Sequence, residues 1–332
     1  MAKVRKSSKV SISGKNGKKR VSSHVYLTSF VNDLEVAEAT SYKNLYVYPV
    51  FRQTLKKVGL KTLSEALKDG LVEIKETGVV KEIEVVNKSK DVKILIMEGD
   101  IVKGGAQNRI LNVSMIIDEE SSVKVPCTCV QQGRWNNFDA KFTEIKTSSP
   151  SMSKAHDQSV FTSMCSSRGS SLYAADQSKV WSEVNCYLAG AGSHDTTKDY
   201  TSAYTSKSDD IKEYKDAFKG KLPEDDESLV GLIVSVGKVV KFDICADHAM
   251  FTLHMDNLLE GCYLDAVSIK DETKEYSAKD MTDFLNSIIT SKVEEFDTPN
   301  KLGVSVVFTG DQVKGNALLY KEDIVHLSAF NS

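Results

Sequence analysis

The sequence of 332 residues contains only five prolines and no long hydrophobic run. No uninterrupted apolar stretch approaches the roughly 20 residues that a membrane-spanning helix needs, and residues 1–24 lack the apolar centre of a secretory signal. Hydrophobic residues make up 41% of the chain and charged residues 27%, which is ordinary for a globular protein. A transmembrane protein, a collagen-like fibre and a wholly disordered chain are therefore excluded, and we expect a cytoplasmic protein.

Acidic residues are missing from residues 1–24, which carry eight basic side chains. The net charge of the whole chain is −3, so subtracting these eight positive charges leaves −11 on residues 25–332. An acidic body argues against nucleic-acid binding. Charge alone would let the tail touch nucleic acid or an anionic membrane, but its Lys/Ser/Gly composition favours a disordered, solubilising tail without nucleic-acid contact. The basic residues are Lys3, Arg5, Lys6, Lys9, Lys15, Lys18, Lys19 and Arg20.

Two cysteines and two histidines raise the question of a metal site. Cys127 and Cys129 would face the same side of a strand, but structural zinc needs four ligands and no second Cys/His pair has a matching spacing. His248 and His254 are six residues apart, which separates them by roughly 120° on a helix. The nearby Asp243 is explained by a solvated strand-to-helix turn. We therefore expect no metal and no cofactor, and reduced thiols in all six cysteines.

Two common catalytic motifs are rejected. Residues 310–315 have the glycine spacing of a phosphate loop, but Asn316 and Ala317 stand where Lys and Ser/Thr would bind phosphate and magnesium. The G-x-S-x-G motif of hydrolases does not occur in the sequence.

Hydrophobic periodicity predicts an α+β fold with mixed, largely antiparallel sheets and flanking helices. Thr62 and Glu65 fit a capping box at the start of a short helix. Residues 72–135 are predicted to form one meandering sheet, and residues 136–175, rich in Ser, Thr and Asn, a long surface loop. Strands are predicted at 46–51, 72–74, 83–85, 94–97, 110–117, 123–130, 229–236, 239–245, 304–308, 317–320 and 324–327. Helices are predicted at 62–69, 176–190, 211–218, 247–260 and 279–293, with a loop at 193–208.

Two polar segments follow strands of the predicted sheet and carry the candidate site. Carboxylates at Glu98 and Asp100 are two residues apart, so they are candidates for general acid–base catalysis. Glycines let a backbone approach a ligand closely, and arginine binds phosphate or carboxylate through two hydrogen bonds. Side-chain amides form hydrogen bonds with polar groups of a ligand, and tryptophan stacks on a base or sugar. The candidate ligand-binding residues are Gly104, Gly105, Gln107, Asn108, Arg109, Gln132, Arg134 and Trp135.

A structural interpretation of the two arginines stays open beside the functional one. Arg109 and Arg134 would then pair with Glu98, with Asp100 or with carbonyls at strand ends. The functional interpretation requires that the two segments meet in space around one polar cavity.

The same residues resemble the ARPP-1 domain, the ARG and rhodanese-phosphatase-superfamily-associated protein domain. The resemblance rests on the runs at 98–100, 104–112, 125–127 and 129–135, and extends outward to 42–49, 176–181, 230–231, 264–266 and 325–328, over about residues 40–330. The sequence departs from the family pattern at Asp100, where the family has Glu, and at Ala106, where it has Lys. The resemblance implies a single domain over residues 25–332, with a division near residue 155 left open. It also implies partners of the ADP-ribosylglycohydrolase or phosphatase type and the handling of ADP-ribose or NAD-derived nucleotides in prokaryotic conflict systems.

Three hypotheses follow for the function. The first is a protein that binds a nucleotide or an ADP-ribose-like ligand through Arg109, Arg134 and Trp135. The second is a metal-independent hydrolase of such ligands, with Glu98 or Asp100 as the general base. The third is a protein-interaction module without a small-molecule ligand, which docks through its basic tail.

Overall fold

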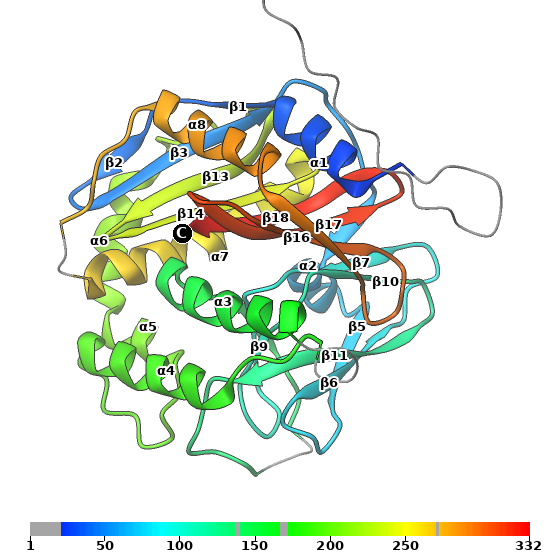
Figure 1. Cartoon of the computed structure of the whole chain (residues 1–332). Helices are drawn as coiled ribbons and strands as arrows, with labels where there is room; N and C mark the ends of the chain where they lie inside the picture. Colours follow the sequence, from blue (N-terminus) through cyan, green and yellow to red (C-terminus); the bar gives the residue numbers. More distant parts are fainter. Residues whose placement is uncertain (1–20, 137–139, 167–171, 270–271) are drawn as a thin grey trace, which may run out of the picture.

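The structure, a computed structural model, describes residues 21–136, 140–166, 172–269 and 272–332 (Figure 1). Within these ranges the chain forms three β-sheets and eight helices, which confirms the predicted α+β class with mixed, largely antiparallel sheets. The basic tail predicted over residues 1–24 lies mostly outside the described residues, and Ser23 and His24 already belong to the first helix. None of the helices in the described ranges is both long and apolar enough to span a membrane.

A nine-stranded sheet, antiparallel throughout, forms the largest layer. Its order is β1-β3-β13-β14-β18-β17-β16-β15, and β2 pairs with β3. The predicted hairpin is confirmed, because β13 and β14 pair from Gly231↔Ile244 to Val236↔Val239 around a glycine with φ +56°. The strands are β1 (Leu34–Val36), β2 (Thr40–Tyr42), β3 (Leu45–Arg52), β13 (Leu229–Val236), β14 (Val239–Cys245), β15 (Lys292–Asp297), β16 (Val304–Thr309), β17 (Val313–Tyr320) and β18 (Asp323–Asn331). The sequence analysis did not predict β15.

Two smaller sheets occupy the other half of the molecule. One has the order β10-β7-β4 and contains the parallel pair β4–β7; the other has the order β12-β8-β9-β11-β6-β5. Their strands are β4 (Leu60–Thr62), β7 (Lys93–Ile96), β10 (Met115–Ile117), β5 (Val72–Glu76), β6 (Glu82–Asn87), β8 (Asp100–Lys103), β9 (Arg109–Leu111), β11 (Ser122–Cys129) and β12 (Glu144–Thr147).

The prediction of one meandering sheet over residues 72–135 is wrong in one respect. The predicted strand 110–117 is two strands, and β9 and β10 belong to different sheets. All residues from Ile110 to Ile117 are buried, so hydrophobic alternation could not mark the break. The break falls at Asn112 and Ser114, whose side chains hydrogen-bond to buried partners outside either sheet.

The predicted surface loop at 136–175 is also wrong for its described part. It contains β12 and the helix α3 (Pro150–Ser166). The buried face of α3 includes the polar residues Ser153, His156 and Asp157, which interrupt its apolar stripe between Met152 and Val160. The predicted loop at 193–208 likewise contains the short helix α5 (Ser202–Ser206), whose Ala203 and Tyr204 are buried.

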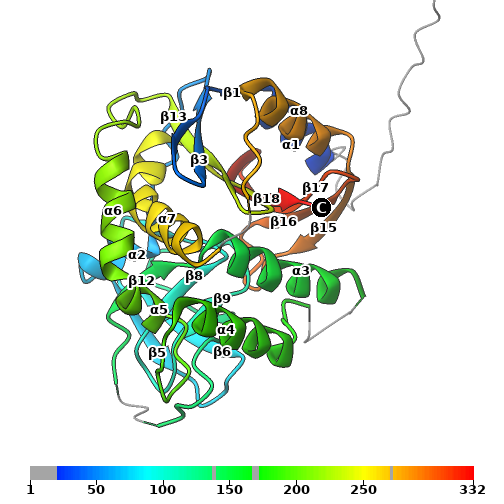
Figure 2. The same cartoon turned by 90° about the vertical axis from the view of Figure 1, so that its left-hand side faces the viewer.

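The remaining helices cover the faces of the nine-stranded sheet. α1 (Ser23–Asn32) and α8 (Ala278–Ile289) pack on one face, and α7 (His248–Ser268) packs on the other, as Figures 1 and 2 show. Half of the predicted capping box of α2 (Leu63–Lys68) is confirmed, because the Thr62 hydroxyl accepts from the Glu65 amide at 3.2 Å, whereas the Glu65 carboxylate accepts from Lys61. The Asp176 carboxylate caps α4 (Gln177–Ala191), and α6 (Ser208–Phe218) follows α5.

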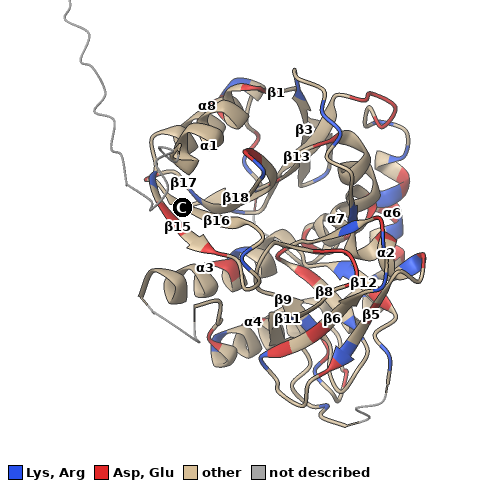
Figure 3. Cartoon of the chain, turned by 90° about the vertical axis from the view of Figure 1, so that its right-hand side faces the viewer, with Lys and Arg blue, Asp and Glu red and all other residues tan. Residues whose placement is uncertain are grey.

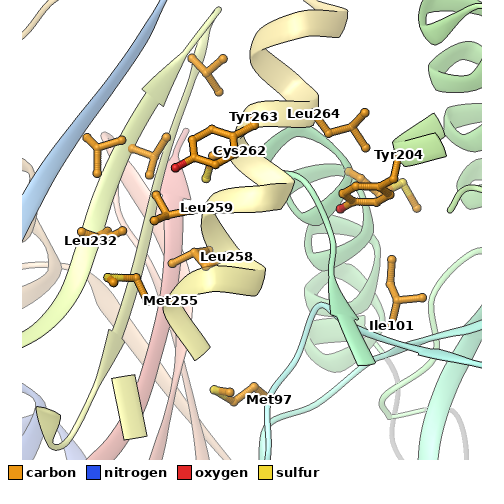
Figure 4. Packing of buried hydrophobic residues seen from close by; sticks show 14 of the residues in the cluster. Met97, Ile101, Tyr204, Leu232, Met255, Leu258, Leu259, Cys262, Tyr263 and Leu264 are labelled. Atoms are coloured by element: carbon orange, nitrogen blue, oxygen red, sulfur yellow. The ribbon is translucent and has the colours of Figure 1, made fainter. Parts of the chain in front are cut away.

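The largest core cluster joins the two halves through α7. Figure 4 shows Leu258, Leu259 and Tyr263 of α7 directed towards Leu232 of β13, with Ile101 of β8 on the other side of the helix. A helix that is buried on both sides is hydrophobic nearly all round, which is typical of a core helix. The two halves therefore share one core, and the polar groups between them are enclosed by it.

Candidate functional site

The two polar segments of the sequence meet in space. β9 pairs with β11 in the register Arg109↔Cys129, so the residues before β9 and those after β11 lie at the same end of the sheet. Arg134 donates from Nη1 to the Gly105 carbonyl and from Nη2 to the Gly104 carbonyl, both at 3.0 Å. Its Nε donates to the Gln131 side-chain oxygen at 2.7 Å. The Arg134 guanidinium therefore fixes the loop at Gly104 and Gly105 by hydrogen bonds to both of its carbonyls.

The paired glycines in that loop are required by the chain's own packing. Gly104 has φ +131° and Gly105 has φ +53°. A Cβ on Gly104 would lie 2.2 Å from the Lys141 carbonyl oxygen, and one on Gly105 would lie 2.3 Å from Cζ of Phe142. The segment at 141–142 therefore occupies the space that the glycines leave open.

Arg109 is fully buried beneath Trp135. Its Nε donates to the Val80 carbonyl at 3.1 Å, its Nη2 lies 3.7 Å from Glu76 Oε2, and its Cζ lies 5.4 Å from the centroid of the Trp135 ring. Neither Nη1 nor Nη2 has a hydrogen-bond partner among the described residues. Trp135 itself is 41% exposed. The acid beside Arg109 is Glu76, which the sequence analysis did not single out because it lies on a distant strand.

The amides of the motif also bind within the protein. Gln107 donates to the Gln131 carbonyl at 3.1 Å, and Asn108 donates to the Asp199 carboxylate at 2.9 Å. Gln132 is exposed. Asp199 is 91 residues from Asn108, so no local pattern could indicate this pair.

The candidate carboxylates Glu98 and Asp100 are both buried between the sheets. Asn316 Nδ2 donates to Glu98 at 2.9 Å, and the Thr147 hydroxyl donates to Asp100 at 3.1 Å. Burial, and then the charge of Asp157, raises the pKa of Glu98 well above its ordinary value. Burial raises the pKa of Asp100 to about 6. Both acids therefore hold their protons more strongly than exposed carboxyl groups do.

A third carboxylate, Asp243, lies at the centre of the buried polar region. It is only 2% exposed, so the prediction of a solvated turn is wrong for it, whereas Asp247 does cap α7. His326 Nε2 lies 3.2 Å, His254 Nε2 3.5 Å and Lys241 Nζ 3.7 Å from its carboxylate. Burial raises the pKa of Asp243, but the hydrogen bonds and charges of the two histidines outweigh burial and leave it well below its ordinary value. The described residues contain no group of three or more His, Cys, Asp or Glu that could hold a metal ion.

Ser114, His326 and Asp243 form a hydrogen-bonded chain that resembles a catalytic triad in composition. Ser114 Oγ lies 2.9 Å from His326 Nδ1, while His326 Nε2 faces Asp243. All three side chains are buried, and the Ser114 hydroxyl also accepts from the backbone N–H of Glu98 at 3.0 Å. The serine is enclosed rather than presented to a substrate, so this chain links the sheets instead of forming an exposed nucleophile.

A second group of buried polar side chains, around His156, ends on Asn112. His156 Nδ1 lies 2.9 Å from Asp157, and His156 Nε2 lies 2.9 Å from Asn112 Oδ1. Asn112 Nδ2 donates to the Tyr173 carbonyl at 2.8 Å, which orients the amide so that its oxygen faces the histidine. Both ring nitrogens of His156 therefore face side-chain oxygens, one of Asp157 and one of Asn112.

Lys241 connects the group around Asp243 with the group around His156. Its ammonium donates to Ser153 Oγ at 2.6 Å, and Ser153 donates to Asp157 at 3.0 Å. Buried ionisable groups are costly unless they are paired. Hydrogen bonds and ion pairs connect six of them: His156, Asp157, Lys241, Asp243, His254 and His326. Glu98 and Asp100 interact with this set through their charges.

A cleft of about 430 Å³ opens beside Asn112. On that side β11 pairs with β6 as far as Glu82↔Pro126, and one more backbone hydrogen bond, from the Cys127 N–H to the Lys81 carbonyl at 3.0 Å, follows before Cys129. Gln177 takes the place of a strand there, because its side chain accepts from the Cys129 N–H at 3.0 Å and donates to the Cys129 carbonyl at 2.8 Å. The side chains that give the cleft its chemistry are Lys81, Asn112, Lys124, Thr128, Gln177 and Lys301.

Five charged side chains line the cleft, and lysines exceed carboxylates by one: they are Lys81, Lys124 and Lys301, with Glu82 and Asp297. Lys124 pairs with Glu82 at 2.7 Å, whereas Lys81 and Lys301 form no ion pair within the described residues. Asn112, and behind it His156, forms the floor. None of the ligand-binding residues predicted from the sequence lines this cleft.

Comparison with known proteins identifies the family of the chain. The model of the ARPP-1 family, the ARG and rhodanese-phosphatase-superfamily-associated protein domain, matches residues 33–330. The chain therefore belongs to this family, as the resemblance predicted. No curated protein and no solved structure matches the chain. Asn112 and Gln177, which lie in the runs that carry the resemblance, line the cleft.

Proposed function

We propose that this member of the ARPP-1 family binds a phosphate-bearing small molecule of the nucleotide class in the cleft beside Asn112. The observation that carries the proposal is the combination of Lys81, Lys124 and Lys301 at the mouth with a polar floor. Lysine is a common phosphate ligand because its ammonium is a compact point charge. The volume of about 430 Å³ falls within the range of small-molecule sites.

The walls of the cleft suit the uncharged parts of such a ligand. Leu172, Pro126 and Pro299 offer apolar surface for a base. Asn112 and Gln177 offer amide groups of the kind that read ring nitrogens and hydroxyls. The family name points to ADP-ribose chemistry, so ADP-ribose and NAD-derived nucleotides are the first ligands to test, and a partner of the ADP-ribosylglycohydrolase or phosphatase type fits the same context.

Isothermal titration calorimetry of the full chain with ADP-ribose, NAD and cyclic ADP-ribose tests the proposal. The variant Lys81→Gln/Lys301→Gln should bind at least about tenfold more weakly, because a hydrogen bond to a charged group contributes roughly 1.5–3 kcal/mol. Lys90→Gln/Lys221→Gln removes the same charge from exposed positions that do not line the cleft, and should bind as the wild type does. No heat with any of the three nucleotides would overturn the proposal.

The motif around Arg109 is a second candidate position for the ligand. It is favoured by the two guanidinium nitrogens that lack a hydrogen-bond partner among the described residues and by the exposed Trp135 above them. Trp135→Ala separates the two positions. If the ligand stacks on Trp135, this variant weakens binding by about fivefold or more, because stacking of a base contributes about 1–3 kcal/mol; if the ligand lies in the cleft, affinity is unchanged.

The hydrolase alternative keeps Glu98 or Asp100 as its general base. The pKa of each is raised, and a general base works best when its pKa lies near the operating pH. Neither residue lines the cleft, which disfavours the alternative. Incubation with ADP-ribosyl substrates, followed by mass spectrometry, decides it: identical products from wild type and Glu98→Gln would remove Glu98 from catalysis. The interaction hypothesis depends on the basic tail, and unchanged partner recovery after deletion of residues 1–24 would reject it.

A further inference from the structure

A second hollow of about 560 Å³ adjoins the cleft across the turn that follows β15. Asp297 and Lys301 line both hollows. The second hollow continues over Tyr26 of α1 and Tyr320 at the end of β17. A ligand that lies across this turn would therefore contact both sites.

The turn between the hollows is held in place by several hydrogen bonds. The Lys301 N–H donates to the Thr298 carbonyl at 2.8 Å, and the Thr298 N–H donates to the Gly303 carbonyl at 3.1 Å. Asn300 Nδ2 donates to the Ile116 carbonyl at 2.6 Å, which ties the turn to β10. Lys301 has φ +60°, a conformation that persists in a non-glycine residue only when its surroundings hold it. Its ammonium is therefore carried by a well-supported backbone at the boundary of the two hollows.

The two hollows differ in charge. Asp297 and Lys301 line both hollows. Of the other charged side chains, the first hollow has Lys81, Lys124 and Glu82, and the second has Glu295, Glu322 and Lys321. Figure 3 shows the acidic positions along β15 that contribute to this difference. Carboxylates repel phosphate but accept hydrogen bonds from hydroxyl groups. The first hollow and the turn therefore suit the phosphates, and the second suits an uncharged end group rich in hydroxyls.

We infer that the site takes a nucleoside diphosphate that carries a sugar on its outer phosphate. The nucleoside end lies in the cleft, the diphosphate lies over Lys301, and the terminal sugar lies in the second hollow between Tyr26 and Tyr320. Asp297, which lines both hollows, accepts from sugar hydroxyls beside the diphosphate. This inference rests on the proposed function, because it extends the same site.

The test compares AMP, ADP and ADP-ribose as ligands of the full chain in calorimetry. ADP-ribose should bind at least about tenfold more tightly than ADP, since only ADP-ribose reaches the second hollow. Tyr26→Ala should remove most of that gain and leave the affinity for ADP unchanged. Glu322→Gln, at an exposed position, is the second variant and should reduce the gain without affecting the fold. Thr28→Ala on the same helix, outside the second hollow, is the matched control and should keep the gain.

Three results would contradict the inference, and they can be told apart. Equal affinities of the wild type for ADP and ADP-ribose would overturn the second hollow and leave the proposed function intact. A gain that survives both Tyr26→Ala and Glu322→Gln would place the sugar elsewhere and also overturn it. If none of the three ligands binds, the proposed function itself fails, and the inference fails with it.

Discussion

His156 Nε2 and Asn112 Oδ1 lie 2.9 Å apart, and this contact connects the cleft floor to the buried ionisable groups. Asn112 lines the cleft, whereas His156 is fully buried. The connection means that the orientation of a floor side chain depends on a buried histidine–aspartate pair in the interior. Four predictions follow from the buried contacts around the site.

The variant His156→Leu should lower the free energy of unfolding by about 3–5 kcal/mol, because it leaves the buried Asp157 carboxylate with only the hydrogen bond from Ser153 among its contacts described above. Urea denaturation at pH 7 measures the loss. Gln158→Ala, an exposed position on the same helix, should change stability by no more than about 0.5 kcal/mol. A loss below about 1 kcal/mol for His156→Leu would show that the pair is not an ion pair.

Asp100 should make stability depend on pH between about 4 and 6. Burial raises its folded-state pKa to about 6, above the ordinary unfolded value near 3.8. The folded protein therefore binds the proton more strongly than the unfolded chain does, so the contribution of Asp100 is fully present below about pH 4 and is lost as the pH rises through 6. Urea unfolding of wild type and Asp100→Asn at pH 4, 5, 6 and 7 should show the difference between them changing by up to about 3 kcal/mol. Parallel profiles would contradict the assignment.

Gly104→Ala should destabilise the protein more than an ordinary left-handed glycine does. The new Cβ would lie 2.2 Å from the Lys141 carbonyl oxygen, and φ +131° is strained for any side chain. Gly59→Ala, with φ +70° and nothing within 4 Å of the new Cβ, is the matched control and should cost only the roughly 1–2 kcal/mol of the conformation itself. Thermal unfolding compares the two, and equal melting temperatures would mean that the 141–142 segment yields easily.

Arg134→Ala should cost about 2–3 kcal/mol, because the carbonyls of Gly104 and Gly105 lose their donors. Arg134→Lys keeps the charge but cannot reproduce the planar fork of donors, so it should lose most of the same stability. Chemical denaturation of both variants measures this. Wild-type stability in Arg134→Lys would indicate that charge, rather than the hydrogen-bonded loop, is what Arg134 contributes.

Sequence patterns correctly predicted the elements that are determined by a few neighbouring residues, such as turns and helix caps. The β13–β14 hairpin and the Thr62 cap are confirmed because turn and cap chemistry act over two to four positions. The prediction failed at residues 110–117, where every position is buried and the period carries no information about the break. It failed again at α3, because buried polar residues on the inward face of that helix interrupt the apolar stripe by which buried helices are recognised.

The candidate site was predictable only in part. The polar motif is visible in the sequence, and the structure does bring its two segments together. The burial of Asp243 and the role of Asn112 were not predictable, since their partners His326 and His156 lie on elements far away in the sequence.

The order of residues by itself determined the α+β class, the family, the caps and hairpins, and the uneven distribution of charge between residues 1–24 and the rest. Tertiary structure alone decided which polar groups are enclosed and which face solvent. Asn112 meets His156 across 44 positions and Tyr173 across 61, and Glu98 meets Asn316 across 218. Such contacts depend on the path of the whole chain, because desolvation and hydrogen-bond partners are properties of a position in space and not of a stretch of sequence.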